Sequence, residues 1–154
     1  ARLSGRVCRQ SIRERSQNHP ARSRSPAGMC LTPQFKENIR LLGDLGLSLD
    51  LCMRPAEIQD AVELVDACPE TRFIIDHCGN MSVQPDQQQD RAAWEAGMWR
   101  MAECDRVFCK ISGIVATATP GTWQPADLKQ NIDFCLDTFG ETASSSAATG
   151  PSAL

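Results

Sequence analysis

The chain has 154 residues, of which 42% are hydrophobic and 23% are charged, and its formal net charge is −3. This length and composition are sufficient for one packed domain. The acidic balance disfavours nucleic acid as a partner, and the sequence has no apolar run long enough to span a bilayer. We therefore expect a cytoplasmic protein with no nucleic-acid or membrane partner.

Three segments differ in composition. Residues 1–28 hold seven Arg, no Lys, no Asp and one Glu, residues 29–140 are periodic and rich in apolar residues, and residues 141–154 are mostly Ala, Ser, Thr, Gly and Pro. We expect residues 29–140 to form the domain and both ends to be disordered or badly packed, because they have little to bury. We interpret the Arg- and Ser-rich start as misread coding sequence. The alternative is a mitochondrial transit peptide, for which this composition is also typical.

Eight cysteines are distributed along the chain, and no two have the C-x-x-C spacing of a zinc ribbon or a redox dithiol. Most lie in expected strands or on helix faces. This pattern favours free, buried thiols in a reducing compartment over a disulfide framework. The same spacing disfavours another candidate function, that of a cysteine-based redox or metal-storage protein.

In chain order, the first helical pattern begins after Thr32, an expected N-cap, and ends at Gly46. Its apolar residues recur on one face (Phe35, Ile39, Leu42 and Leu45). A strand is expected at 47–52. A second helix follows, opened by Pro55 and stopped by Pro69, and it also has one apolar face (Ile58, Ala61, Val62, Val65 and Cys68).

The second half of the core repeats this alternation. Strands are expected at 72–76 and 107–112, separated by a polar loop and by a helix from about Arg91 to Cys104 whose inner stripe is apolar (Trp94, Met98, Met101 and Ala102). After a loop at 113–124, Pro125 starts a last helix that Gly140 closes. Its apolar positions are Leu128, Ile132, Cys135, Leu136 and Phe139.

Strands that alternate with helices about every thirty residues predict right-handed βαβ units and a parallel sheet. Three strands would make an unusually small sheet with two bare edges. We therefore expect an α/β fold in which the core is part of a larger (β/α) barrel or open sheet.

A short apolar strand ends in Asp76-His77-Cys78-Gly79, which places His77 at the carboxyl end of a strand. In parallel α/β folds this end carries the chemistry. The alternative is a histidine that is merely hydrogen-bonded at a strand end. His19 is the only other histidine in the sequence.

Residues from about 26 to 140 resemble the amidohydrolase-2, or amidohydrolase-related, family of lactonase-like TIM-barrel hydrolases. Three stretches carry the resemblance: 45–52 (LGLSLDLC) is similar to G-L-x-F-D-L, 73–80 (FIIDHCGN) to F-x-x-D-H-x-G-K/N, and 107–113 (VFCKISG) to V-x-x-K-x-S-G. The resemblance implies a partial (β/α)8 barrel of about three βα units. It also implies hydrolysis of a lactone or related ester or amide by activated water, in many members with a divalent metal such as zinc.

The resemblance assigns His77 as the histidine that contacts substrate or metal, and it places Lys110 in the next motif, where it could face the same site. The family's His-x-His pair and the aspartate of its last strand have no counterpart in the sequence. A catalytic zinc needs about three protein ligands. We therefore expect this chain to bind metal poorly and to be inactive, with a non-catalytic remnant or interaction module as the alternative function.

The tail after Gly140 has an explanation that can be checked. One choice of codons for residues 141–154, read from the third base, encodes D-R-V-V-F-G-G-D-W-P, which is similar to the family's last-strand motif. We therefore interpret the tail as an out-of-frame translation.

Overall fold

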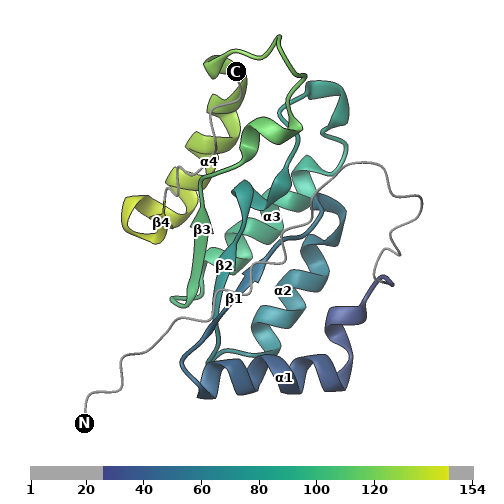
Figure 1. Cartoon of the computed structure of the whole chain (residues 1–154), viewed down its shortest axis with the longest axis vertical. Coiled ribbons are helices and arrows are strands. Elements are labelled where there is room, and N and C mark those ends of the chain that lie inside the picture. Colours follow the sequence, from purple (N-terminus) through teal and green to yellow (C-terminus); the bar gives the residue numbers. More distant parts are fainter. Residues whose placement is uncertain (1–25, 146–154) are drawn as a thin grey trace.

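The computed structural model describes residues 26–145, and it describes side chains for residues 26–140. Our expectations for residues 1–25 and 146–154 lie outside the described residues. Figure 1 shows a central sheet flanked by helices. The strands are parallel and lie in chain order: β1 (Ser48–Leu51), β2 (Arg72–Ile75), β3 (Val107–Lys110) and β4 (Ser144–Ser145).

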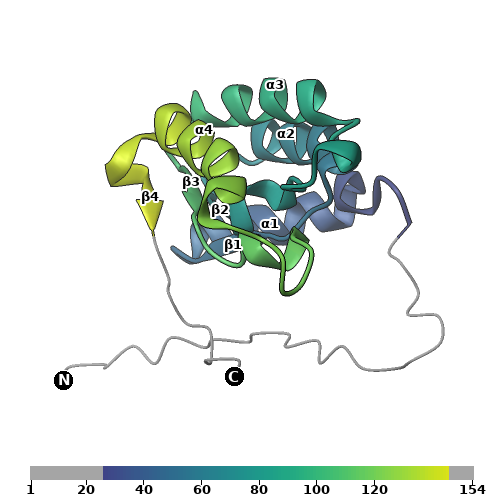
Figure 2. The same ribbon diagram turned by 90° about the horizontal axis from the view of Figure 1, so that it is seen from above.

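The helices alternate with these strands, as the sequence predicts. They are α1 (Pro33–Asp44), α2 (Ile58–Ala67), α3 (Arg91–Ala102) and α4 (Pro125–Ala143). Figure 2 shows α2, α3 and α4 side by side over one face of the sheet, and the contacts of α3 with both of the other helices agree with this view. The opposite face of the sheet carries no α-helix among the described residues.

Helix α1 illustrates how local sequence sets an element. Pro33 occupies the first turn, where its missing N–H costs nothing. Gly46 adopts a φ of 67°, and the N–H of Leu47 then donates to the carbonyl oxygen of Leu42 at 2.9 Å, which closes the helix end. Thr32 precedes the helix but makes no side-chain cap, because its hydroxyl donates backwards to Met29 O at 2.9 Å.

The hydrophobic core lies between the sheet and α2–α4. Phe73 and Ile75 of β2 are 1% and 0% exposed, and the α3 side chains Trp94 and Met98 that face them are fully buried. The expected inner stripe of α3 is therefore confirmed for Trp94, Met98 and Met101, whereas Ala102 is only half-buried.

Two differences from the sequence expectations concern the strands. Each of the three expected strands is shorter than predicted, and the β2 strand ends at Ile75 because the backbone turns left-handed from His77 onward. In addition, Gly140 has a φ of 71°, which breaks α4 and returns the backbone alongside β3 as the two-residue β4. The sheet thus gains a fourth, short strand where we expected none.

In the described part of the chain, the expectation of free thiols is confirmed, whereas burial holds for only some of them and Cys52 is exposed. The seven cysteines of this part are free thiols, and four of them are buried (Cys68, Cys78, Cys109 and Cys135). Cys8 lies outside this part. Between residues 26 and 145, no helix has the length and hydropathy that crossing a membrane requires.

Candidate functional site

The carboxyl ends of β1, β2 and β3 lie together at one edge of the sheet, because the strands are parallel and in register. On the face away from the helices, Asp50, Ile74 and Phe108 are aligned across the three strands. Polar groups follow at the next position of that face, where Asp76 comes directly after β2 and Lys110 ends β3. This edge is where parallel α/β folds place their chemistry.

A left-handed turn follows β2. His77, Cys78, Gly79 and Asn80 have φ values of 55°, 51°, 64° and 55° in succession, and only one of the four is glycine. A left-handed residue other than glycine costs on the order of 1–2 kcal/mol, so the surrounding contacts must hold this turn in place. Asn80 supplies one such contact by donating Nδ2–H to Met53 O at 2.9 Å, which ties the loop after β2 to the loop after β1.

The imidazole of His77 is anchored at the end of β3. Its Nδ1 lies 3.1 Å from the carbonyl oxygen and 3.0 Å from the hydroxyl of Ser112. Because a carbonyl oxygen only accepts, this geometry places a proton on Nδ1, and the neutral form of the ring then has its lone pair on Nε2. No described residue forms a hydrogen bond with Nε2. A neutral imidazole held in this way can contact a substrate hydroxyl, water or cation through Nε2.

Gly113 makes room for this imidazole. A Cβ at this position would lie 2.5 Å from Nδ1 of His77, and the residue also has a φ of 59°. Glycine is therefore required here both by the space and by the backbone conformation. The Ser112-Gly113 pair forms the seat of His77.

Lys110 and Asp76 form an ion pair beside His77. The distance from Nζ to Oδ1 is 2.6 Å, and the side chains are only 23% and 14% exposed. The hydrogen bond to Asp76 raises the pKa of Lys110 despite partial burial, and the charges of Asp76, Asp50 and Cys52 raise it further. Lys110 therefore stays protonated at neutral pH and acts as a fixed positive charge, not as a base.

The structure thus brings both predicted site residues to the same edge, on adjacent strands. Sequence reasoning missed Ser112 as the partner of His77, although it belongs to the same motif as Lys110. The left-handed Asn80 was missed as well. In both cases the only available signal was a position next to a predicted strand end.

The residues at this edge do not assemble a metal site by themselves. Within residues 26–145, no group of three or more His, Cys, Asp or Glu side chains could hold a metal ion. The acid next to His77 is already paired with Lys110. The donor set in the described part of the chain therefore does not fit a catalytic metal, and we assign no chemical step to one.

Comparison with known proteins agrees with this architecture. The sequence profile of the amidohydrolase family matches residues 13–142. The chain belongs to the amidohydrolase family. This confirms the resemblance seen in the sequence.

Three relatives illustrate the match. An amidohydrolase from Burkholderia multivorans, crystallised with bound HEPES, superposes with a TM-score of 0.73 at 21% identity, covering 81% of this chain and 46% of that one. Amidohydrolase 2 from Bifidobacterium longum subsp. infantis superposes with a TM-score of 0.62 at 27% identity, over 80% of this chain and 43% of its own. The uncharacterized protein y4mH of Sinorhizobium fredii is 26% identical over 109 residues, which are 71% of this chain and 35% of that protein.

The chain therefore spans less than half the length of each of these relatives. A second crystal form of the Burkholderia multivorans protein contains bound zinc, with a TM-score of 0.72 and 22% identity to this chain. The similarity to the Burkholderia protein concerns the fold.

Proposed function

We propose that this chain supplies about three consecutive βα units of a (β/α)8 hydrolase that opens a lactone or related cyclic ester with an activated water molecule. The anchored imidazole of His77 carries this proposal. It lies at the carboxyl end of a parallel strand, Ser112 fixes its tautomer, and Nε2 has no partner in the described part of the chain. Family membership supports the hydrolase class, whereas the lactone comes from the sequence resemblance.

In this proposal the two predicted residues have different roles. His77 contacts the substrate, or a metal bound by ligands from elsewhere in a whole barrel, through the lone pair of Nε2. Lys110 remains charged because of Asp76, so it stabilises negative charge on the lactone carbonyl oxygen as water adds to the carbonyl carbon. Cleavage of the ring C–O bond then yields a hydroxy acid, with the proton from water passing to the leaving alkoxide.

The isolated 154-residue chain is expected to be inactive. Lactone hydrolysis requires the reacting groups to be held together, and about three βα units supply only part of the site of a (β/α)8 barrel. A second candidate function, a non-catalytic remnant or interaction module, is favoured by the lack of any three-ligand cluster within residues 26–145.

The deciding experiment is to sequence genomic DNA and transcript across both ends of the 29–140 core, and then to express the longest product that contains this core. We expect that product to hydrolyse members of a lactone panel. His77→Ala should lower kcat/KM by on the order of 100-fold or more. Lys110→Met should also lower it, whereas Lys129→Met, which removes a lysine from an exposed ion pair on α4, should leave it unchanged.

The outcome separates the two functions. If sequencing finds no product longer than this chain, and the chain hydrolyses no lactone, the hydrolase proposal fails for this protein. The second candidate function, a non-catalytic remnant or interaction module, is then supported. If a longer product is active but His77→Ala retains full activity, the site assignment is wrong although the hydrolase class stands. Turnover by the 154-residue chain alone would contradict the expected inactivity.

A further inference from the structure

A second concave site lies beside β1, and its wall includes the last residues of that strand and the loop after it. It is a cavity of about 230 Å3 between the segment at residues 26–30, α1, α2 and β1. Most of its wall is apolar, formed mainly by Cys30, Phe35, Leu49, Leu51, Met53 and Leu64. This volume has room for roughly seven or eight water-sized groups, which corresponds to a small organic molecule.

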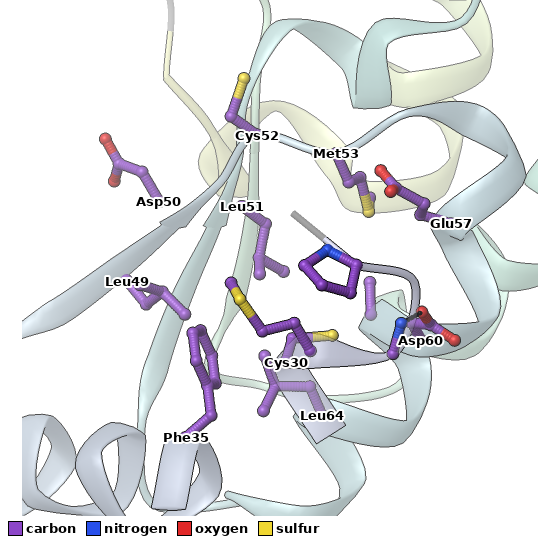
Figure 3. A pocket seen from close by; sticks show the side chains of 14 residues that line it. Cys30, Phe35, Leu49, Asp50, Leu51, Cys52, Met53, Glu57, Asp60 and Leu64 are labelled. Atoms are coloured by element: carbon purple, nitrogen blue, oxygen red, sulfur yellow. Dashed lines mark hydrogen bonds between the residues drawn. The ribbon is translucent and has the colours of Figure 1, made fainter. Parts of the chain in front are cut away.

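The charged residues in the wall are all acidic. They are Asp50, Glu57 and Asp60, and within residues 26–145 no Lys, Arg or His contributes to the lining. Figure 3 shows that Asp50 and Cys52 point away from the cavity, on the other side of β1 from Leu49 and Leu51. Both Glu57 oxygens are engaged by Arg54, through its backbone N–H and its guanidinium. Asp60 is therefore the acid whose charge is least compensated at this site.

Asp60 is positioned but not neutralised. Its Oδ2 accepts the backbone N–H of Gly28 at 3.1 Å, and no described residue forms an ion pair with its carboxylate. Burial raises the pKa of the neighbouring Cys30 thiol, and the negative charges of Asp60 and, to a smaller extent, Glu57 raise it further.

The two ends of the cavity differ in chemistry. Figure 3 shows Phe35 and Leu49 on one side and Asp60 on the other. An apolar body would be buried against the first side, and a cation would face the carboxylate at the second, where a partly buried pair is stronger than one in bulk water.

We propose that this cavity binds a small organic monocation, namely a primary ammonium compound with a compact apolar body, whose charge faces Asp60. Neither His77 nor Lys110 lines this cavity, and the proposal does not depend on the proposed function.

The chain's five methionines make a direct test possible. Met29 and Met53 line the cavity, whereas Met81, Met98 and Met101 are buried in the core at 1%, 0% and 1% exposure. The 154-residue chain, labelled with 13C at the methionine methyl groups, is titrated with phenethylammonium, 2-phenylethanol or 3-phenylpropionate. These probes are similar in size and differ in charge.

We expect phenethylammonium to shift the Met29 and Met53 signals in a saturable way and to leave the three core signals in place. The neutral alcohol should bind at least several-fold more weakly, and the carboxylate should not bind. Asp60→Asn, which keeps an acceptor for the Gly28 N–H, should weaken ammonium binding roughly fivefold to tenfold. Glu63→Gln, on the exposed side of the same helix, should leave it unchanged.

Three results would overturn the proposal. Equal shifts with all three probes would show that charge plays no part. Absence of any shift at Met29 and Met53 would show that the cavity is closed or filled by chain outside residues 26–145. Core methionine signals that collapse to one position would show that the packed walls of the cavity do not form.

Discussion

The two faces of the sheet differ in what holds them together. On the face under α2–α4, Leu51, Phe73, Ile75, Val107 and Cys109 are 0–8% exposed and pack as one apolar layer. On the other face, Asp50 is exposed and Ile74 and Phe108 are only half-buried. At the carboxyl ends of the strands, the Lys110–Asp76 ion pair and the hydrogen bond between His77 and Ser112 take the place of apolar packing. Stability is concentrated on one face and potential chemistry on the other.

The largest expected effect tests the covered face. Phe73→Ala should lower the free energy of unfolding by about 3–5 kcal/mol, because Phe73 is fully buried and its removal leaves a cavity. Phe108→Ala, on the open face of the neighbouring strand, should cost only about 1–2 kcal/mol. Urea unfolding of both variants measures the difference. Equal losses would mean that the second face is also packed, by chain outside the described residues.

The next effect tests the seat of His77. Gly113→Ala places a Cβ against the imidazole and adds left-handed strain, so we expect a loss of about 2–3 kcal/mol in unfolding free energy. Gly121→Ala is the matched control, since its φ is 78° but nothing lies within 4 Å of its Cβ position. It should show only the conformational cost of about 1 kcal/mol. A loss at Gly113 no greater than that at Gly121 would contradict the close approach to His77.

The third prediction compares two lysine–aspartate pairs. Lys110→Met should destabilise the chain by about 1–2 kcal/mol at neutral pH, because Asp76 is left largely buried without its partner. Lys129→Met, whose pair with Asp133 is exposed on α4, should change stability by less than about 0.5 kcal/mol.

The pH dependence of the Lys110 effect follows from its raised pKa. A group whose pKa is raised in the folded state stabilises the fold below its unfolded pKa, here ordinarily 10.5, and loses that contribution as pH rises through the folded value. The difference between wild type and Lys110→Met should therefore be constant near neutral pH and shrink only in strongly alkaline solution. A difference that shrinks between pH 6 and pH 8 would rule out this ion pair as its source.

The smallest effect concerns the tautomer of His77. Long-range 1H–15N correlation spectra of the two histidines should show the Nδ1–H form for His77. Ser112→Ala should keep this tautomer, because the backbone carbonyl oxygen remains, and should cost only about 0.5–1 kcal/mol. An Nε2–H tautomer in the wild-type chain would remove the basis for a contact through Nε2.

The fold of the described residues was largely predictable, because its signals are local. Pro33 and Gly46 bound the first helix region, and the apolar run at 73–75 locates β2. The strand ends were overestimated because apolar residues such as Ile111 continue beyond the last paired position. Pairing ends where the partner strand turns away, and a single sequence does not record that position.

The site was predictable only in part. His77 was identified from its place at the end of an apolar strand, and Lys110 from the family motif that contains it. The role of Ser112 depends on a left-handed turn that rotates His77 toward the neighbouring strand. Left-handed φ values at His77 and Cys78 could not be predicted, because only about a few per cent of residues other than glycine adopt them.

The buried cysteines provide a built-in probe of conformational opening. Cys68, Cys78, Cys109 and Cys135 come from four separate parts of the domain, and each has 0% exposure. The hydrogen bonds with Cys109 and Cys78, together with burial, raise the pKa of Cys135, so its thiol stays protonated and unreactive while the core is intact. Cys52, by contrast, is exposed. An alkylating reagent would therefore modify Cys52 at once and the buried four only as fast as the protein opens. Residue-resolved mass spectrometry of that reaction would give the opening kinetics of each part of the domain without mutation or added dye.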